Sequence, residues 1–210
     1  MIEASAWLAK RVDQVKSTGR CDDLVASART GRAVGNPHDA NPKQRFAIAL
    51  VLQTLRNWAD RGADRPIRLL TAGVAGTGKS FIIHAPCALV RNLLGADEAD
   101  RVFAPTGVSA SQVGGETGRR LFRLPTGKKA CGQLGPLKGD PLRAAQGNLR
   151  QCALLIGDER GMIGRTMIGR KEYNASLSPF AKTPQSGGSY SWGGRPVENL
   201  LGDDLQIPLS

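Results

Sequence analysis

The stretch GVAGTGKS, residues 73–80, has the spacing of a phosphate-binding loop. Its glycines allow the backbone to wrap around phosphate oxygens, with the N–H groups pointing inward. We expect Lys79 to reach the β- and γ-phosphates of a nucleotide and the Ser80 hydroxyl to ligate Mg²⁺. The residues predicted to hold the nucleotide here are Gly73, Val74, Ala75, Gly76, Thr77, Gly78, Lys79 and Ser80.

The flanks of this loop predict a strand before it and a helix after it. IRLLTA, residues 67–72, is a short apolar run suited to a buried strand, and residues 80–94 have helical length and content. This order places the phosphates at a helix N-terminus, where the helix dipole favours anions. Pro86 lies inside the predicted helix and is expected to kink or shorten it, because proline removes a backbone hydrogen bond.

Further strands are predicted at 102–104, 153–159 and 199–203, alternating with helical segments. This alternation indicates an α/β fold, with a mainly parallel sheet covered by helices on both faces and ligands at the carboxyl ends of the strands. Residues 1–40 read as a polar, basic and poorly ordered arm, 41–210 as the domain, and 174–194 as a mobile Ser/Gly/Pro-rich loop.

The helix predicted just ahead of the first strand, residues 41–62, has Asn41 as its N-cap and Pro42 at its first helical position. Its expected apolar face comprises Phe46, Ala49, Leu50, Val51 and Leu55.

The chain is strongly basic, with a formal net charge of +11 over 210 residues. Between 119 and 171, twelve Lys and Arg stand against Asp140, Asp158 and Glu159. A basic stretch in a nucleotide-binding protein favours a polyanionic partner, most simply nucleic acid; the alternative is a solvated basic face. No apolar run approaches the length of a transmembrane helix, so no membrane partner is expected. The 4 cysteines are widely spaced, which predicts buried thiols and neither a zinc site nor a disulfide framework.

The stretch LLIGDERGM, 154–162, is the natural partner of the phosphate-binding loop. An apolar strand that ends in Asp158 and Glu159 delivers two carboxylates to the phosphate end of the sheet. Asp158 would hold Mg²⁺ and Glu159 would polarise the attacking water. The alternative is an ordinary surface Asp-Glu pair. Gly157 is expected to loosen the strand, because glycine is a weak strand residue.

Two glutamines are further candidates. Gln206, after the strand predicted at 199–203, is placed to sense the γ-phosphate. Gln44, in the helix ahead of the first strand, can read adenine through paired hydrogen bonds.

Together these stretches resemble the Pif1-like family of superfamily 1 DNA helicases, especially the forms allied to helitron transposons. NPKQR at 41–45 is similar to the family's adenine-reading motif, and GVAGTGKS to its Walker A loop. APTGVSASQVGGETGRRLF at 104–122 resembles the long signature that follows. LLIGDERGMIG resembles the Asp-Glu box, and WGGRPVENLLGDDLQIP at 192–208 the third motif.

The resemblance implies a RecA-like P-loop NTPase domain that uses ATP and Mg²⁺ and binds single-stranded DNA across the tops of its strands. It implies that Thr106 and Gly107 contact the DNA backbone, with Thr117, Arg119 and Phe122 nearby. Members of the family unwind duplex DNA in the 5′ to 3′ direction, and a nuclear or mitochondrial location would follow.

The sequence departs from the family pattern at several positions. Arg119 stands where histidine is usual, and Gly161 where serine is usual. Glu198 and Asn199 occupy strand positions that are expected to be apolar, which suggests a disturbed strand. The resemblance implies a second motor lobe after this one, and because the sequence given stops at Ser210 we expect that lobe to be absent from it. Without its arginine finger, ATP turnover is expected to be slower by roughly 10³–10⁵.

Three functions therefore compete. The first is the N-terminal motor lobe of an ATP-dependent DNA helicase. The second is a degenerate module that binds ATP and DNA but does not unwind, which Gly157, Gly161 and the polar strand favour. The third, a P-loop kinase or GTPase, ranks last because the guanine-reading N-K-x-D motif is absent.

Overall fold

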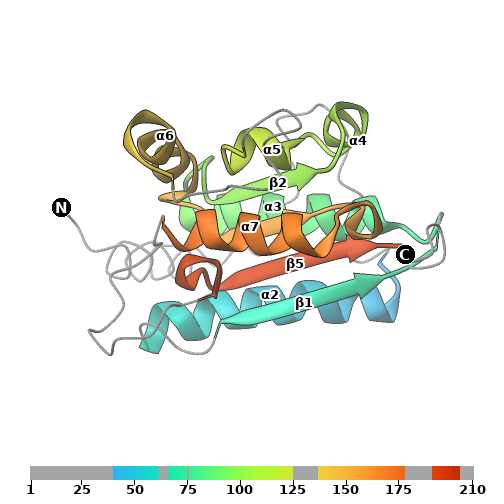
Figure 1. Cartoon of the computed structure of the whole chain (residues 1–210). Helices are drawn as coiled ribbons and strands as arrows, with labels where there is room; N and C mark the ends of the chain where they lie inside the picture. The colour runs from blue at the N-terminus through green and yellow to red at the C-terminus, as the bar shows by residue number, and fades with distance from the viewer. Residues whose placement is uncertain (1–39, 62–65, 75, 125–136, 178–190, 204–210) are drawn as a thin grey trace.

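The computed structural model describes residues 40–61, 66–74, 76–124, 137–177 and 191–203, and its centre is one five-stranded sheet (Figure 1). The strands are β1 Ile67–Ala72, β2 Asp100–Ala104, β3 Glu116–Thr117, β4 Leu154–Gly157 and β5 Val197–Gly202. Their order across the sheet is β1-β5-β4-β2-β3, and every neighbouring pair is parallel. The predicted parallel sheet is confirmed, whereas the predicted arm at 1–40 lies outside the described residues except for Ala40.

Helices cover both faces of this sheet, as predicted. Those in the described residues are α2 Pro42–Arg61, α3 Lys79–Leu94, α4 Gly107–Gln112, α5 Gly118–Leu121, α6 Gly139–Leu149 and α7 Arg165–Ser176, together with the short 3₁₀ helices η4 Arg160–Met162 and η5 Ser191–Gly194. α2 and α3 pack on one face, and α5, α6, α7 and η5 contribute to the core on the other. Within the described ranges, no helix combines the length and the apolar character that a membrane span requires.

The central strands supply alternate side chains to the two faces. In β4, Leu154 and Ile156 belong to the core under α2 and α3, while Leu155 belongs to the opposite core. In β2, Val102 and Phe103 divide in the same way. This period of two, with apolar residues on both sides, is typical of a parallel strand that is buried on both faces.

The start of α2 is fixed by a reciprocal cap. The backbone N–H of Gln44 donates to Asn41 Oδ1 at 3.0 Å, and the backbone N–H of Asn41 donates to Gln44 Oε1 at 2.9 Å. Such a capping box satisfies two N–H groups that the first turn leaves without helical partners. Asn41 is therefore the N-cap that the sequence predicts, and Pro42 is the first helical residue.

The predicted apolar face of α2 is wrong in part. Val51 and Leu55 are buried, but Phe46 and Ala49 are exposed. The buried face of α2 instead comprises Ile48, Val51, Thr54, Leu55 and Trp58.

Pro86 does not shorten α3, which continues to Leu94 and ends at Gly95 with positive φ. Proline and its neighbours in this helix are buried against the sheet and α2, so packing supports the turn that lacks one hydrogen bond. Tertiary packing here outweighs a local preference.

β5 is a regular strand despite its polar residues, and the expected disturbance is wrong. It pairs in unbroken register with β1 on one side and with β4 on the other. Asn199 is buried and accepts a hydrogen bond from Thr71 Oγ1 at 2.9 Å, while Glu198 is buried 3.5 Å from Arg68 Nε. Asn199 is therefore hydrogen-bonded to β1, and Glu198 has an oppositely charged neighbour there, although Glu198 Oε1 has no hydrogen-bond partner among the described residues. These contacts leave β5 regular in the middle of the sheet.

The segment 174–194 is not one continuous loop. Its first residues, Asn174–Ser176, complete α7, and its last four form η5; residues 178–190 lie outside the described part. Arg195, just after η5, is fully buried and donates to the carbonyls of Ala175, Trp192 and Leu149. Its guanidinium therefore joins the ends of α6 and α7 to η5.

Cys87 and Cys152, the two cysteines among the described residues, are buried free thiols, as the sequence predicts. Burial raises the pKa of Cys87 well above its usual value and the pKa of Cys152 to about 11. Both thiols therefore stay protonated and unreactive at neutral pH.

Candidate nucleotide and DNA site

The phosphate-binding loop joins β1 to α3, at the carboxyl end of the sheet. Gly76 and Gly78 have φ angles of 79° and 82°, which only glycine adopts readily. The ammonium of Lys79 donates to the carbonyls of Gly73 at 2.6 Å and Val74 at 3.1 Å. The lysine thus spans the inside of the loop, and a phosphate there would take over these hydrogen bonds.

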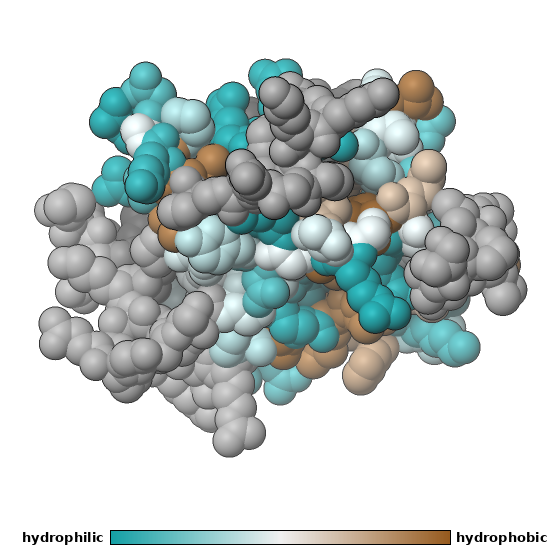
Figure 2. All heavy atoms as spheres, viewed as in Figure 1, coloured by the Kyte–Doolittle hydropathy of each residue, from teal (hydrophilic) through white to brown (hydrophobic). Residues whose placement is uncertain are grey.

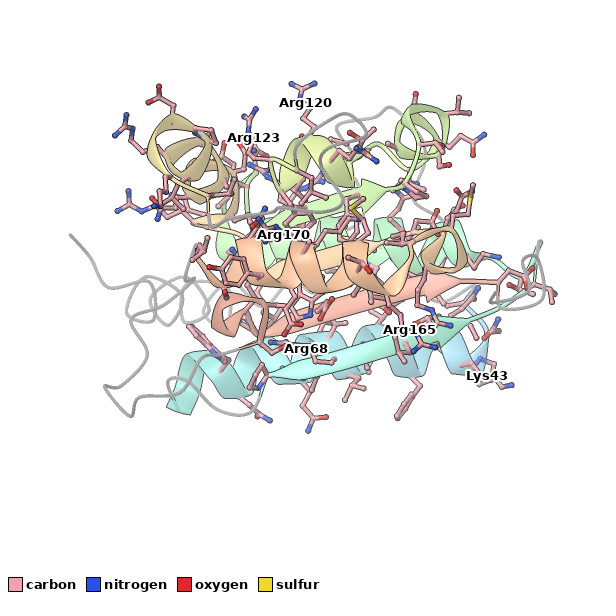
Figure 3. All side chains as sticks on the ribbon, viewed as in Figure 1. Lys43, Arg68, Arg120, Arg123, Arg165 and Arg170 are labelled. Atoms are coloured by element: carbon pink, nitrogen blue, oxygen red, sulfur yellow. The ribbon has the colours of Figure 1, made fainter. Side chains whose placement is uncertain are left out.

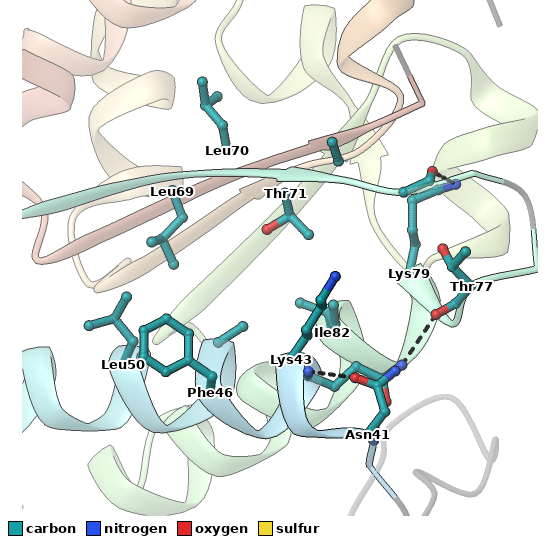
Figure 4. A pocket seen from close by; sticks show the side chains of 14 residues that line it. Asn41, Lys43, Phe46, Leu50, Leu69, Leu70, Thr71, Thr77, Lys79 and Ile82 are labelled. Carbon is teal, nitrogen blue, oxygen red and sulfur yellow. Dashed lines mark hydrogen bonds between the residues drawn. The ribbon is translucent and has the colours of Figure 1, made fainter. Parts of the chain in front are cut away.

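Gln44 lies against this loop. Its Nε2 donates to the carbonyl of Thr77 at 3.3 Å and lies 3.5 Å from that of Gly78 (Figure 4). A cavity of about 580 Å³ opens beside it, between α2 and β1. Its lining includes Asn41, Lys43, Gln44, Phe46, Leu69, Thr71, Gly73, Thr77 and Lys79. A flat base would find apolar walls here and an amide at one end.

The carboxylates Asp158 and Glu159 meet Lys79 on the other side of the loop. All three line a second cavity of about 160 Å³, with Gly161, Met162, Gly202 and Asp203. The structure therefore brings the predicted catalytic lysine and carboxylates together, with Lys79 shared by both cavities.

Asp158 fits the predicted metal ligand. Its Oδ1 is buried and has no hydrogen-bond partner among the described residues. Burial raises the pKa of this carboxyl and the charge of Glu159 adds to the rise, whereas the backbone hydrogen bond at Glu159 and the charge of Lys79 oppose it. A cation in this cavity would remove the penalty for the charged form. Ser80, the other predicted ligand, is exposed in the first turn of α3.

Within the described ranges, no cluster of three His, Cys, Asp or Glu side chains is placed to hold a metal ion. Mg²⁺ does not need such a cluster, because it is commonly bound through one or two carboxylates together with water and nucleotide phosphates.

Glu159 has an unusual backbone conformation and an unpredicted partner. Its φ is 51°, in the left-handed region, and its Oε2 accepts a hydrogen bond from Ser109 Oγ at 2.6 Å. Ser109 in turn lies 2.6 Å from Thr106 Oγ1. The sequence shows Ser109 within a signature stretch, but only the fold brings α4 against the residue after β4.

The residues expected to contact DNA follow β2 and β3, which are paired so that Ala104 lies beside Thr117. Thr106 and Thr117 are the N-caps of α4 and α5, and each side chain accepts a backbone N–H three residues on. Thr106, Gly107 and Arg119 are exposed. These polar groups therefore form neighbouring turns near the cavity that contains Asp158 and Glu159.

Phe122 does not share this exposure. It is fully buried, with its ring 5.1 Å from that of Phe103 and 6.0 Å from that of Trp192, both edge-on. Phe122 therefore offers no surface for direct contact with DNA, and its expected place near bound DNA remains a prediction.

Lys171 occupies a small cavity next to these turns. The cavity, about 160 Å³, is also lined by Pro105, Gly118 and Arg119. The ammonium lies 4.7 Å from the centre of the Phe103 ring, and burial, with Arg119 nearby, lowers the pKa of Lys171 to about 8. The sequence showed only a charge in a basic run, whereas the structure shows a buried cation.

The described residues of the basic stretch belong to several elements. They lie in or next to α5, α6, η4 and α7, and Figure 3 shows Arg120 and Arg123 by α5 and Arg165 and Arg170 on α7. Arg120 lies 3.5 Å from Glu116, and Arg143 is paired with Asp140. Figure 2 shows the same mixed distribution of hydrophilic side chains over this face.

Two predicted site residues, Ala75 and Gln206, lie outside the described residues, and their roles remain predictions.

Comparison with known proteins identifies the family. A model described as PIF1-like helicase matches residues 44–208. The chain belongs to this family. An ATP-dependent DNA helicase, PIF6 of Trypanosoma brucei brucei, is 34% identical over 140 residues, which are 65% of this chain and 16% of that protein. The kinase and GTPase alternative is therefore set aside.

Solved PIF1-like structures share the RecA-like fold. Pif1 helicase from Candida albicans matches with a TM-score of 0.55 at 22% identity, covering 81% of this chain and 34% of that one. Pif1 helicase from Bacteroides, in complex with ADP-AlF3 and single-stranded DNA, matches with a TM-score of 0.53 at 20% identity, covering 81% and 33%. The chain thus spans about a third of these solved PIF1-like proteins.

Proposed function

We propose that this chain is the nucleotide-binding motor lobe of an ATP-dependent DNA helicase. The observation that carries the proposal is the place of Lys79, which lines both the large cavity beside Gln44 and the small cavity that contains Asp158 and Glu159. A nucleotide whose base lies beside Gln44 would extend its phosphates past Lys79 toward the two carboxylates.

Each residue then has one role in hydrolysis. Lys79 would exchange its bonds to the loop carbonyls for bonds to the β- and γ-phosphates. Glu159 would accept a proton from the water that attacks the γ-phosphorus, as the bond to ADP breaks. Asp158 and Ser80 would hold Mg²⁺, which neutralises charge on the phosphates. Gln206 is proposed to sense the γ-phosphate.

Single-stranded DNA is the proposed partner of the turns at Thr106 and Thr117. Their hydroxyls, the backbone at Gly107 and the cation of Arg119 suit phosphates and carry no base-reading geometry. Unwinding of duplex DNA in the 5′ to 3′ direction is proposed for the whole protein, in which this lobe would act with a second motor lobe.

A module that binds ATP and DNA without unwinding is the second candidate, but two features that favoured it do not hold in the structure. β5 is a regular strand, and Gly157 leaves no gap, because a Cβ atom there would collide with Phe103 and Leu200. The motor-lobe proposal is therefore favoured.

The direct test measures binding of a fluorescent ATP analogue and of a labelled oligo-dT by the full chain, with Lys79→Ala as the loop variant. Arg143→Ala, an exposed residue of α6 paired with Asp140, is the matched control for loss of one positive charge. We expect Lys79→Ala to abolish nucleotide binding and Arg143→Ala to preserve it.

DNA binding should weaken steeply with salt, since phosphate contacts release counterions. Unchanged nucleotide binding by Lys79→Ala would refute the nucleotide site. A flat salt response would remove nucleic acid from the proposal.

A further inference from the structure

A chain of short hydrogen bonds connects the proposed DNA contact to the proposed catalytic carboxylate. Thr106 Oγ1 lies 2.6 Å from Ser109 Oγ, and Ser109 Oγ lies 2.6 Å from Glu159 Oε2. Thr106 is exposed, whereas Ser109 is buried and cannot itself meet a large ligand. The three residues thus form a path from the surface to the cavity of Asp158 and Glu159.

The direction of each hydrogen bond follows from the chemistry of the groups. An ionised carboxylate only accepts, so the single hydroxyl hydrogen of Ser109 is donated to Glu159. The short contact between Thr106 and Ser109 then needs the Thr106 hydroxyl to donate to Ser109 Oγ. The backbone N–H of Ser109 donates to Thr106 Oγ1 at 3.2 Å, which leaves that oxygen able to donate its own hydrogen.

A phosphate oxygen at Thr106 would reverse this direction. Phosphate diesters only accept, so a bound DNA phosphate would take the hydrogen of the Thr106 hydroxyl. Ser109 Oγ would then face a Thr106 oxygen that offers no hydrogen but can accept one. Rotation of the Ser109 hydroxyl toward Thr106 restores that hydrogen bond and withdraws the donor from Glu159.

We propose that Ser109 is a positioning residue. In the absence of DNA its hydroxyl donates to Glu159, and it releases Glu159 when the Thr106 hydroxyl donates to a DNA phosphate. This inference rests on the proposed function. While Glu159 Oε2 accepts the Ser109 hydroxyl, that oxygen is occupied. Release therefore frees it to accept a hydrogen bond from the attacking water.

The coupling between the two sites is reciprocal, so the hydrogen bond between Ser109 and Glu159 must also weaken DNA binding. If DNA binding breaks this bond, a protein that lacks it binds DNA more tightly. Ser109→Ala removes the hydroxyl but keeps the backbone N–H that caps Thr106. The cap of α4 is therefore preserved, and a change in DNA affinity reports the side-chain bond.

The experiment compares wild type with Ser109→Ala in the full chain, using oligo-dT and ATP with Mg²⁺. We expect Ser109→Ala to raise DNA-free ATP turnover by about two- to tenfold, the usual worth of one hydrogen bond, and to lower the stimulation by oligo-dT. In fluorescence anisotropy, the same variant should bind oligo-dT more tightly, by up to about tenfold.

A second pair of variants tests the surface end of the path. Thr106→Ser keeps a hydroxyl and should retain stimulation by DNA, whereas Thr106→Val should lose it. Thr106→Val also removes the cap of α4, so its urea unfolding is measured alongside.

The outcomes separate the two proposals. If wild type hydrolyses ATP and binds oligo-dT, but Ser109→Ala matches it in DNA-free turnover and in DNA affinity, the role of Ser109 is overturned alone. If wild type binds DNA but turns over too slowly to measure, the affinity of Ser109→Ala decides. If wild type neither binds oligo-dT nor exceeds Lys79→Ala in turnover, the proposed function fails and this inference fails with it.

Discussion

Gly157 lies directly against the ring of Phe103: a Cβ atom at residue 157 would be 2.5 Å from Phe103 Cζ and 2.7 Å from Leu200 Cδ2. Phe103 is itself buried beside Phe122 and Lys171, so a shift of its ring would disturb both contacts. The glycine that appears weak in the sequence is therefore the residue that lets β4 approach its neighbours.

Gly157→Ser should destabilise the protein by about 1–3 kcal/mol, the usual cost of overpacking a core. Gly161→Ser is the matched control, because a Cβ there would meet only the carbonyl oxygen of Asp203 at an ordinary 3.5 Å. Urea unfolding at neutral pH checks both variants. Equal stabilities for the two would show that the crowding at Gly157 is relieved at no cost.

Lys171→Met should stabilise the protein at pH 7, by about 1–3 kcal/mol, because methionine fills a similar volume without burying a charge. The pKa of Lys171 falls from 10.5 in the unfolded chain to about 8 in the fold. Between about pH 8 and pH 10.5 the folded state therefore binds fewer protons than the unfolded chain. The free energy that folding loses at pH 7 by burying the charged lysine disappears as pH rises through this range.

Urea unfolding of wild type and Lys171→Met across this range provides the check. The stability gap should narrow with rising pH. A gap that stays constant would mean that Lys171 keeps its charge without penalty.

Glu198→Gln should flatten the pH dependence of stability. Burial raises the pKa of the Glu198 carboxyl to about 8, against the favourable charges of Arg68 and Arg195 and with the unfavourable charge of Glu172. The folded state therefore keeps a proton that the unfolded chain releases near pH 4.5. The stability of wild type relative to Glu198→Gln should fall as pH rises from about 4.5 to about 8.

Denaturant midpoints of the two proteins at pH 5, 6.5 and 8 measure this difference. Parallel profiles would show that the ion pair with Arg68, 3.5 Å away, keeps Glu198 charged throughout.

Gln44→Ala should weaken ATP binding by about three- to thirtyfold and reduce the preference for ATP over GTP, because the amide beside Thr77 and Gly78 is lost. Gln53→Ala, an exposed glutamine of the same helix, is the control. Competition of ATP and GTP against a fluorescent nucleotide tests both variants. An unchanged preference would mean that Gln44 only caps α2.

The parts of the site that could be predicted from sequence are those in which chemistry and conformation are local. The loop at 73–80 carries its glycines, lysine and serine in one stretch, and Asp158 with Glu159 ends an unmistakable apolar run. Because parallel strands end at the same edge of a sheet, these local patterns were enough to place Lys79 near the two carboxylates.

The parts that could not be predicted depend on partners far away in the chain. Thr71 and Asn199 are 128 residues apart, so the sequence alone shows a polar strand residue without its hydrogen-bond partner. Ser109 and Glu159 are 50 residues apart, and nothing near either one indicates the hydrogen bond. Phe46 is exposed for a related reason, because the pattern of a helix does not determine which of its apolar side chains the sheet covers.

The position of β5 between β1 and β4 also bears on how the lobe is made during translation. β1 has no other strand partner among the described residues, although it is the first of the five strands to be synthesised. It must wait until residues 197–202 have left the ribosome before its ladder can form, while β2, β3 and β4 can already pair with one another. The nascent chain would therefore carry a phosphate-binding loop whose preceding strand has no ladder until β5 is made, so the nucleotide site would mature after the pairing of β2, β3 and β4.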